Sequence, residues 1–476
     1  DAPGGGRRYI ARRSGASESW ALKSPRNKAQ CSSPQGQCQC RCASPSTANT
    51  APLDLWDAQV EDVMAVYGGL KRWGRTQAPK LILTRGKWSI TTPRETNSRA
   101  GSADRSVEIV ASGRLMFKNL TAGKELFIPR VWCKATVLSE ERVDQCFQVD
   151  TCITPRHDLS DGYPSPDSHP RKDGYWSTYI VKGGGRTFVD VAVTITPTST
   201  GQLTRRRGDG VEKITSCCLE VGYECYGPDG ISQHSQHIAL PLKFPDASLE
   251  PKRVATGGAA DSACEAFAIP THLLYHGDDP VSVIEKYVKP HVQPGDVLAV
   301  AETPLAIMQG RYRHPATIRP SWLAKLLCRC FHPTSSVATA CGMQALMDIV
   351  GSVRIIAAVV AGIVAKVFRV AGMFYRIAGD QAGLMDDITG TIAPYDKFIC
   401  LGPQHCEKFV EDVGTTLGID TAVVDVNDLS KETKMLTILA KARGVDSDCL
   451  HKALLANPAG NADQQTPFVL IRQPKA

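Results

Sequence analysis

The chain has 476 residues, 42% of them hydrophobic, and a formal net charge of +7. One hydrophobic core rarely supports this length, so we expect at least two folded domains. Residues 1–50 hold eight Lys and Arg against Asp1 and Glu18, a surplus of +6 (8 − 2), which leaves +1 (7 − 6) for the rest. A nucleic-acid-binding groove concentrates basic residues in the folded part, so we expect no nucleic-acid partner.

Residues 1–50 are rich in Arg, Ser, Gly and Pro and lack apolar periodicity. This composition is typical of an organellar transit segment, whereas a secretory signal has an apolar core. We therefore predict a disordered, transit-like leader over 1–50, with a plain disordered linker as the alternative.

The chain contains 17 Cys, an odd number without a repeated spacing. This pattern argues against a secreted disulfide framework and favours a reducing compartment. Cys328, Cys330 and His332 form a local cluster that could hold a metal ion, but a second pair of ligands is missing nearby. We interpret these cysteines as buried or half-exposed thiols, and a zinc site as the alternative.

Residues 51–105 are predicted to form a short helix and a linker. Leu53, Trp56, Val60 and Val63 have the spacing of one helical face. From residue 76 to 105, weak strand signals alternate with Pro, Asn, Ser and Gly, which is typical of a linker.

Residues 106–246 have the texture of an antiparallel β-sandwich domain. Short β-rich runs are separated by turn residues, and Val189, Val191, Val193 and Ile195 alternate with smaller or polar residues as in a half-buried strand. About seven such strands in 140 residues can bury one face each against a second sheet. A domain of this type commonly binds another protein.

A second linker is predicted at 247–268, followed by a mixed α/β domain at 269–476. Val297–Ala301 and Thr421–Val426 are continuous apolar runs after turn residues, as expected of buried strands. Helical patterns flank them at 321–328, 336–350, 353–371, 405–417, 430–443 and 446–456.

The segment Ile355–Val364 is strongly apolar but too short for a membrane span, which needs about 20 residues. We interpret it as a buried helix. The alternative is peripheral contact with a membrane, for which Arg369 and Arg376 would suit an anionic surface.

Two segments of the second domain combine carboxylates with small residues. Gly379–Gly390 contains Asp386 and Asp387, and Ala422–Asp428 contains Asp425. Carboxylates beside small residues let a nucleotide or a metal ion approach the backbone. The alternative is that these acids cap helices and turns.

Residues 279–476 resemble the coenzyme F420-0:L-glutamate (γ-glutamyl) ligase family. Gln309–Arg311 is similar to the family's E-G-R segment, Ala382–Leu384 with the acids that follow to its N-A-G-I-D segment, and Val423–Asn427 to its I-T-D-T-N segment. The run from His332 to Asp463 is more similar still to cyanobacterial and plastid ligase-like proteins, which implies a location in the chloroplast stroma. The N-terminal β region resembles a cyanobacterial domain.

The resemblance implies that GTP, or ATP, activates a small carboxylate as an acyl phosphate and that an amino acid then displaces the phosphate. Mg²⁺ or Mn²⁺ would neutralise the phosphates. The relatives also suggest a homodimer. The implied site residues are Asp386, Asp387 and Asp425 for the metal, Arg311 and Asn427 for catalysis, and Gly310, Ala382 and Gly383 for the cofactor.

The chain departs from the family pattern at five positions. Ala306–Ile307 stands where the family has Ser-Lys, Gln309 replaces an acid, Met385 aligns with the Asp of N-A-G-I-D unless the register slips by one, and Val426 replaces a Thr. Each change removes a charge or an oxygen from the implied site. Two hypotheses follow: a metal- and nucleotide-dependent ligase with an altered substrate, or a non-catalytic plastid scaffold or assembly factor that reuses the fold.

Overall fold

All residues that the computed structural model describes belong to one compact unit within residues 47–476. The predicted leader at 1–50 lies outside the described residues. The structure describes residues 53–67, 80–92, 108–139, 147–161, 175–197, 213–254, 264–333, 335–370, 372–387, 392–427, 435–454 and 465–472.

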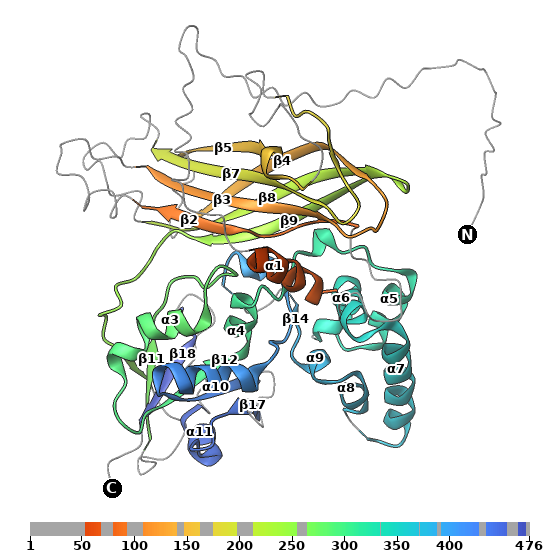
Figure 1. The fold of residues 1–476 in the computed structure, drawn as a ribbon. Coiled ribbons are helices and arrows are strands. Elements are labelled where there is room, and N and C mark those ends of the chain that lie inside the picture. Colours follow the sequence, from red (N-terminus) through yellow and green to blue (C-terminus); the bar gives the residue numbers. More distant parts are fainter. Residues whose placement is uncertain are drawn as a thin grey trace, which may run out of the picture. The chain divides into compact units, whose positions relative to one another are not determined.

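A β-rich part comes first and contains two antiparallel sheets (Figure 1). The five-stranded sheet has the order β1-β3-β7-β5, with β2 also paired to β3. The four-stranded sheet has the order β6-β4-β8-β9. The strands are β1 (Leu81–Leu83), β2 (Lys87–Thr91), β3 (Ile109–Asn119), β4 (Leu126–Ser139), β5 (Phe147–Arg156), β6 (Tyr179–Val181), β7 (Arg186–Pro197), β8 (Ile214–Gly227) and β9 (Gly230–Pro241).

Both sheets contribute to one hydrophobic core. Val189, Val191, Val193 and Ile195 are buried on β7, which confirms the predicted alternation, and they share a cluster with side chains of the four-stranded sheet such as Leu219. At the opposite face of β3 and β7, the ring of Trp56 from α1 (Leu53–Ala65) packs edge-on against Phe188, with 5.2 Å between ring centroids.

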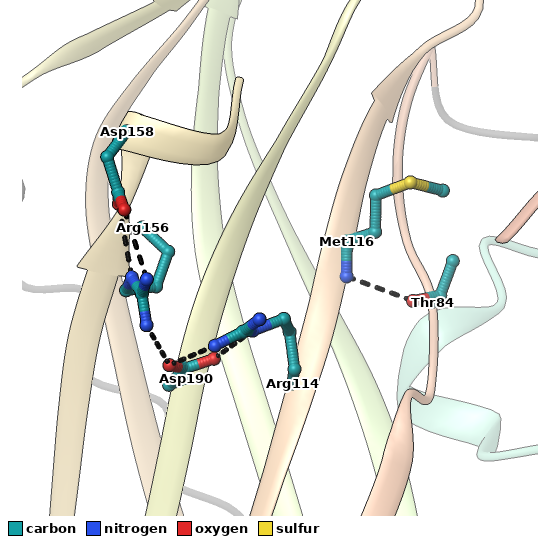
Figure 2. Close-up of polar contacts among 6 residues, drawn as sticks. All are labelled: Thr84, Arg114, Met116, Arg156, Asp158 and Asp190. Carbon is teal, nitrogen blue, oxygen red and sulfur yellow. Dashed lines mark hydrogen bonds and ion pairs between the residues drawn. The ribbon is translucent and has the colours of Figure 1, made fainter. Parts of the chain in front are cut away.

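The prediction of a linker over 76–105 is wrong at β1 and β2. Both strands pair with β3, and the Met116 amide donates to Thr84 Oγ1 at 3.0 Å just after β1 (Figure 2). The predicted strands also omitted β5, which contains Pro155. That proline is compatible with a strand because β5 lies at the sheet edge, where one side of the backbone has no ladder partner.

A ladder of charges crosses three strands of the five-stranded sheet (Figure 2). Arg114 on β3 lies opposite Asp190 on β7 and donates to it from Nε at 2.6 Å and from Nη2 at 2.9 Å. Arg156 on β5 donates to Asp190 at 3.1 Å and to Asp158 at 3.1 and 3.0 Å. Each acid of the ladder therefore has an arginine partner.

The C-terminal α/β part contains a six-stranded sheet with the order β10-β11-β18-β12-β16-β17. β12 and β16 run parallel, and their neighbours pair antiparallel. One face packs against α3 and α10, and the other packs against α11. These elements are β10 (Lys252–Val254), β11 (Glu265–Ile269), α3 (Pro280–Tyr287), β12 (Val297–Ala301), α10 (Cys406–Leu417), β16 (Asp420–Asn427), β17 (Met435–Lys441), α11 (Ser447–Leu454) and β18 (Phe468–Arg472).

Two predictions for this part are wrong. Residues 430–443 were expected to be helical, but Met435–Lys441 is strand β17, in which Ile438 pairs with Val424 of β16. The predicted linker at 247–268 contains β10 and the beginning of β11. Both differences depend on strand partners distant in the sequence, which local propensity does not show.

A small sheet and a group of helices complete this part. The sheet has the order β13-β15-β14, and the helices from α5 to α9 share one hydrophobic cluster. The elements are α4 (Glu302–Met308), β13 (Tyr312–Arg313), α5 (Trp322–Leu327), α6 (Ala340–Val350), α7 (Ser352–Val367), α8 (Met373–Ala378), α9 (Asp380–Gly383), β14 (Asp386–Asp387) and β15 (Ile399–Cys400).

Helix α7 contains the apolar segment 355–364, and the interpretation as a buried helix holds for one face of it only. Ile355, Ala358 and Val359 are buried, but Val360 and Val364 are exposed. No single helix within the described ranges is long and apolar enough to cross a membrane. Helices α6 and α7 together have the length and apolar composition of a span, but the chain bends by 116° between them.

Candidate functional site

Two carboxylates meet at the carboxyl ends of the parallel strands β12 and β16. Ala301, the last residue of β12, is the register partner of Val424, so Glu302 follows at the level of Asp425. Glu302 is buried at the first position of α4, and Asp425 is half-buried. The carboxyl edge of parallel strands is the common place for ligand-binding groups in α/β sheets.

A third carboxylate comes from the small sheet. Asp386 on β14 pairs with Cys400 on β15, and Asp386 Oδ2 accepts a hydrogen bond from Thr303 Oγ1 at 3.0 Å. The same hydroxyl lies 2.7 Å from Glu302 Oε1. Thr303 therefore joins the acids of α4 and β14, and we call Glu302, Asp386 and Asp425 the acid cluster.

The pKa values show that these acids lie in one another's field. Burial, followed by the charges of Asp425 and Asp386, raises the pKa of Glu302 to about 8. Burial and the charge of Asp386 raise the pKa of Asp425 to about 6, and burial raises the pKa of Asp386. None of the described ion pairs contains a member of the acid cluster, and no basic group is among the causes of these three pKa shifts.

The hydroxyl of Thr303 limits the protonation states of the cluster. A hydroxyl carries one hydrogen, so it donates to one carboxylate at a time. The second short contact is satisfied when the other of the two acids is protonated and donates to Thr303 Oγ1. Glu302, whose pKa is raised to about 8, carries such a proton at neutral pH.

The donor set fits Mg²⁺ or Mn²⁺ by chemistry, because both prefer carboxylate and hydroxyl oxygens. In the part of the chain that the structure describes, however, no three His, Cys, Asp or Glu side chains have the spacing of a metal site as they stand. Cation binding would therefore require the acids to move closer together. The Cys328 cluster does not meet that criterion either: Cys328 is buried and Cys330 is exposed.

The structure does not bring Arg311 to the acid cluster. Its guanidinium is buried, where Nε donates to the Gly402 carbonyl at 2.6 Å and Nη2 donates to Gln381 Oε1 at 2.8 Å. Burial lowers the pKa of Arg311 to about 10. The charge that partly opposes this decrease belongs to Cys406 and not to the acid cluster. Its Nη1 is buried without a described partner, so one donor is left for a ligand oxygen.

Gly310 contacts the β-rich part. Its φ is +67°, and its carbonyl accepts a hydrogen bond from Arg85 Nη1 at 2.6 Å. The positive φ favours glycine here, and a Cβ would lie 2.7 Å from the same nitrogen, so a larger residue would also displace the Arg85 side chain. Gly310 as a cofactor-binding residue stays a prediction.

The other predicted residues are spread over three elements. Ala382 is buried and Gly383 is exposed in α9. Asp387 and Asn427 lie in β14 and β16, but their side chains are outside the described part. Of the predicted residues, Asp386 and Asp425 are therefore the two that the structure brings together.

Sequence reasoning missed Glu302 and Thr303. The available signal was an acid immediately after the buried run Val297–Ala301, in the same relation to its strand as Asp425 in the run that begins at Thr421. Only the parallel pairing of β12 with β16 shows that the two acids are neighbours.

Ala306 and Ile307, which replace the family's Ser-Lys, are buried in α4. They have no polar side-chain atoms, so neither can donate to a phosphate. The implied nucleotide contact is therefore missing at this position.

One family matches the β-rich part by sequence. It is described as the N-terminal Ig-like domain of F420-0:gamma-glutamyl ligase, and it matches residues 82–244. The match begins within β1, so the strands that were predicted to be a linker belong to this domain. No curated protein matches the chain.

Several solved structures match about a third of the chain. The GAE domain of yeast GGA1 is 9% identical, covers 35% of this chain and 96% of its own, and has a TM-score of 0.16. The GAE domain of GGA2p from Saccharomyces cerevisiae is 12% identical, covers 35% of this chain and 95% of its own, and has a TM-score of 0.16. The ASH/PapD-like domain 7 of human CEP192 is 10% identical, covers 37% of this chain and 95% of its own, and has a TM-score of 0.18.

The chain thus combines a β domain similar to the Ig-like N-terminal domain of a γ-glutamyl ligase family with a mixed α/β part. This similarity supports a relationship to the ligase family through that first domain.

Proposed function

We propose that the chain is a divergent metal- and nucleotide-dependent ligase that joins a small carboxylic acid to an amino acid. The observation that carries this proposal is the acid cluster, in which three acids share a desolvated site without a described basic partner. The match of the first domain to a γ-glutamyl ligase family supports the reaction class. The single core shared by both sheets supports a sandwich arrangement of that domain.

Glu302, Asp386 and Asp425 would hold the cation, which when bound would neutralise phosphate charge. Thr303 Oγ1 lies within hydrogen-bonding distance of both Glu302 and Asp386 and so links the two acids. Asp425, with a pKa of about 6, is mostly ionised at pH 7, which suits a ligand of a cation. Glu302, with a pKa of about 8, still carries its proton at that pH.

A titration of the full chain with Mn²⁺, measured by isothermal titration calorimetry, tests the site directly. We expect binding by the wild type and at least tenfold weaker binding by Asp425→Asn and Glu302→Gln. Each removes a carboxylate ligand, and cation binding would release the proton that Glu302 carries at neutral pH. Glu411→Gln, an exposed acid on α10, is the matched control and should bind as the wild type does. Equal binding by all four proteins would refute the acid cluster as a cation site.

Phosphate release from GTP and ATP, with candidate carboxylic and amino acids present, tests the ligase itself. We expect release that depends on Mn²⁺ or Mg²⁺ and disappears in Asp425→Asn. Cation binding without nucleotide binding, measured by thermal shift on the same protein, would keep the cation site and reject the ligase.

A second function, as a non-catalytic interaction protein, is favoured by the surroundings of Arg311 and by Ile307. The Arg311 guanidinium is engaged by Gly402 and Gln381, and Ile307, at the position of the family's Lys, offers no cation for phosphate. The β-rich domain would then carry the partner-binding surface. Turnover that is lost in Asp425→Asn would contradict this function.

A further inference from the structure

The outer face of α7 consists of apolar side chains that no described part of the chain covers. The relative exposure is 80% for Val353 and 77% for Val367, and it is 74% for Phe368 directly after the helix. The other large apolar side chains exposed along α7 are Ile356, Val360, Ile363 and Val364.

These residues form one stripe. At 3.6 residues per turn, positions 353, 356, 360, 363, 364 and 367 fall within about 120° of the helix circumference. The buried residues Ile355, Ala358, Val359 and Ala365 occupy the opposite side, where α7 packs on the cluster shared by α5 to α9. A surface helix normally presents polar residues on its outer face. Helix α7 differs, because both its buried face and its outer face are apolar.

The charges around this stripe have one sign. From Gly351 to Gly379 the sequence contains no Asp or Glu, and it contains Arg354, Lys366, Arg369 and Arg376. All four are exposed. The nearest preceding acid, Asp348, is buried and paired with Arg313 at 2.7 Å, so it does not neutralise this surface.

We propose that the outer face of α7 binds the surface of an anionic lipid bilayer. An apolar stripe flanked by Lys and Arg suits a helix that lies in the membrane plane, with its apolar side chains among the upper acyl groups and its basic side chains near the lipid phosphates. The 16 residues of α7 provide about 24 Å of such contact.

The same charges disfavour a second copy of the chain as the occupant. A two-fold contact through this stripe would place four basic side chains opposite four others, without a carboxylate between Gly351 and Gly379 to separate them. An anionic bilayer removes that repulsion. The proposal is independent of the acid cluster and of ligase activity.

Vesicle co-sedimentation of the full chain tests the proposal. We expect binding to vesicles of phosphatidylcholine with 30% phosphatidylglycerol, at least tenfold weaker binding to phosphatidylcholine alone, and weakening as salt is raised. Val360→Glu/Val364→Glu should reduce binding at least tenfold, because it places two carboxylates on the inserted stripe. Lys366→Glu/Arg369→Glu should reduce it at least fivefold.

Two matched variants control for the position of each change. Ile231→Glu alters an exposed apolar residue of β9, and Lys408→Glu reverses an exposed charge on α10; neither should alter vesicle binding. Circular dichroism and thermal melting check that each variant is folded. Residues 1–50 are also basic, so binding that is unchanged in the α7 variants would assign it to the leader and overturn the proposal.

Two further results would overturn the proposal. One is a failure of the folded wild type to bind anionic vesicles. The other is a dimer, measured by analytical ultracentrifugation, that dissociates in Val360→Glu/Val364→Glu and does not bind vesicles.

Discussion

Two groups of acids, the charge ladder of the β-rich part and the acid cluster of the α/β part, have opposite surroundings. In the β-rich part, Asp190 and Asp158 are bound by Arg114 and Arg156, and the hydrogen bond from Arg156 lowers the pKa of Asp158 (Figure 2). In the α/β part, the acid cluster has no basic partner among the described ion pairs, and the pKa values of all three acids are raised.

The difference separates ionised acids that stabilise the folded state from buried acids whose ionised form destabilises it. A paired acid favours the folded state in its ionised form, whereas a buried acid without a partner is more stable in its neutral form. Raised pKa values that cluster at the carboxyl edge of a sheet indicate a functional site. Variants that remove charges of each kind therefore test the comparison.

The largest effect is expected for the buried pair Arg313–Asp348, whose side chains are 3% and 2% exposed. Arg313→Met keeps much of the volume but leaves Asp348 buried with Gln344 as its remaining partner. We expect a loss of about 3–5 kcal/mol in the free energy of unfolding, measured by urea denaturation.

The double variant Arg313→Met/Asp348→Leu should recover much of that loss, because both buried charges are removed. Burial raises the pKa of Asp348 even beside Arg313, which agrees with a large desolvation cost. A double variant no more stable than Arg313→Met would show that the loss comes from packing and not from charge.

The next effect concerns Glu302 and pH. Its pKa rises from an ordinary 4.5 to about 8 on folding, so between these values the folded state binds more protons than the unfolded state. The stabilisation from the neutral acid is complete below about pH 4.5 and is lost as the pH rises through about 8. Glu302 alone gives a slope of up to about 1.4 kcal/mol per pH unit.

Glu302→Gln removes this dependence, so the variant should be about as stable as the wild type near pH 5. At pH 8 it should exceed the wild type by up to about 4 kcal/mol, the slope of about 1.4 kcal/mol acting over about three pH units. Urea denaturation at a series of pH values measures the difference, and Glu407→Gln on α10, an exposed acid, is the control. Parallel pH profiles for the wild type and Glu302→Gln would contradict the raised pKa.

A smaller effect is expected in the charge ladder. Asp190→Asn weakens the contacts to both Arg114 and Arg156, whose side chains are 21% and 28% exposed. We expect a loss of about 1–2 kcal/mol that decreases at high salt, because these groups are only half-buried. A loss of the same size at 0.1 and 1 M salt would indicate a packing effect instead.

The smallest effect is expected at Arg253–Glu265, an ion pair whose side chains are 70% and 42% exposed. Arg253→Ala should change the free energy of unfolding by less than about 0.5 kcal/mol, since solvent screens such pairs. Thermal melting is sufficient to detect a larger change, which would show that pairing alone, without burial, determines the contribution.

Several features were predictable from the sequence because they depend on local pattern. The alternation from Val189 to Ile195 identified β7, and the apolar runs Val297–Ala301 and Thr421–Val426 identified β12 and β16. The order of a β domain before an α/β domain followed from such runs. Asp386 and Asp425 were recognised as candidate ligands by their positions beside small or apolar residues.

Other features were decided by the tertiary structure. Strands β1, β2 and β17 exist through pairing with distant partners, and the exposure of α7 depends on which side of the helix its neighbours cover. Arg311, predicted beside the acids, bonds to Gly402 and Gln381 instead.

The site illustrates the same division. The sequence by itself determined which residues could carry charge at strand ends, because strand period and residue type are local properties. The tertiary structure decided that Glu302, 123 residues before Asp425, completes the cluster, because parallel pairing of β12 with β16 is a non-local contact that hydrophobic period does not encode.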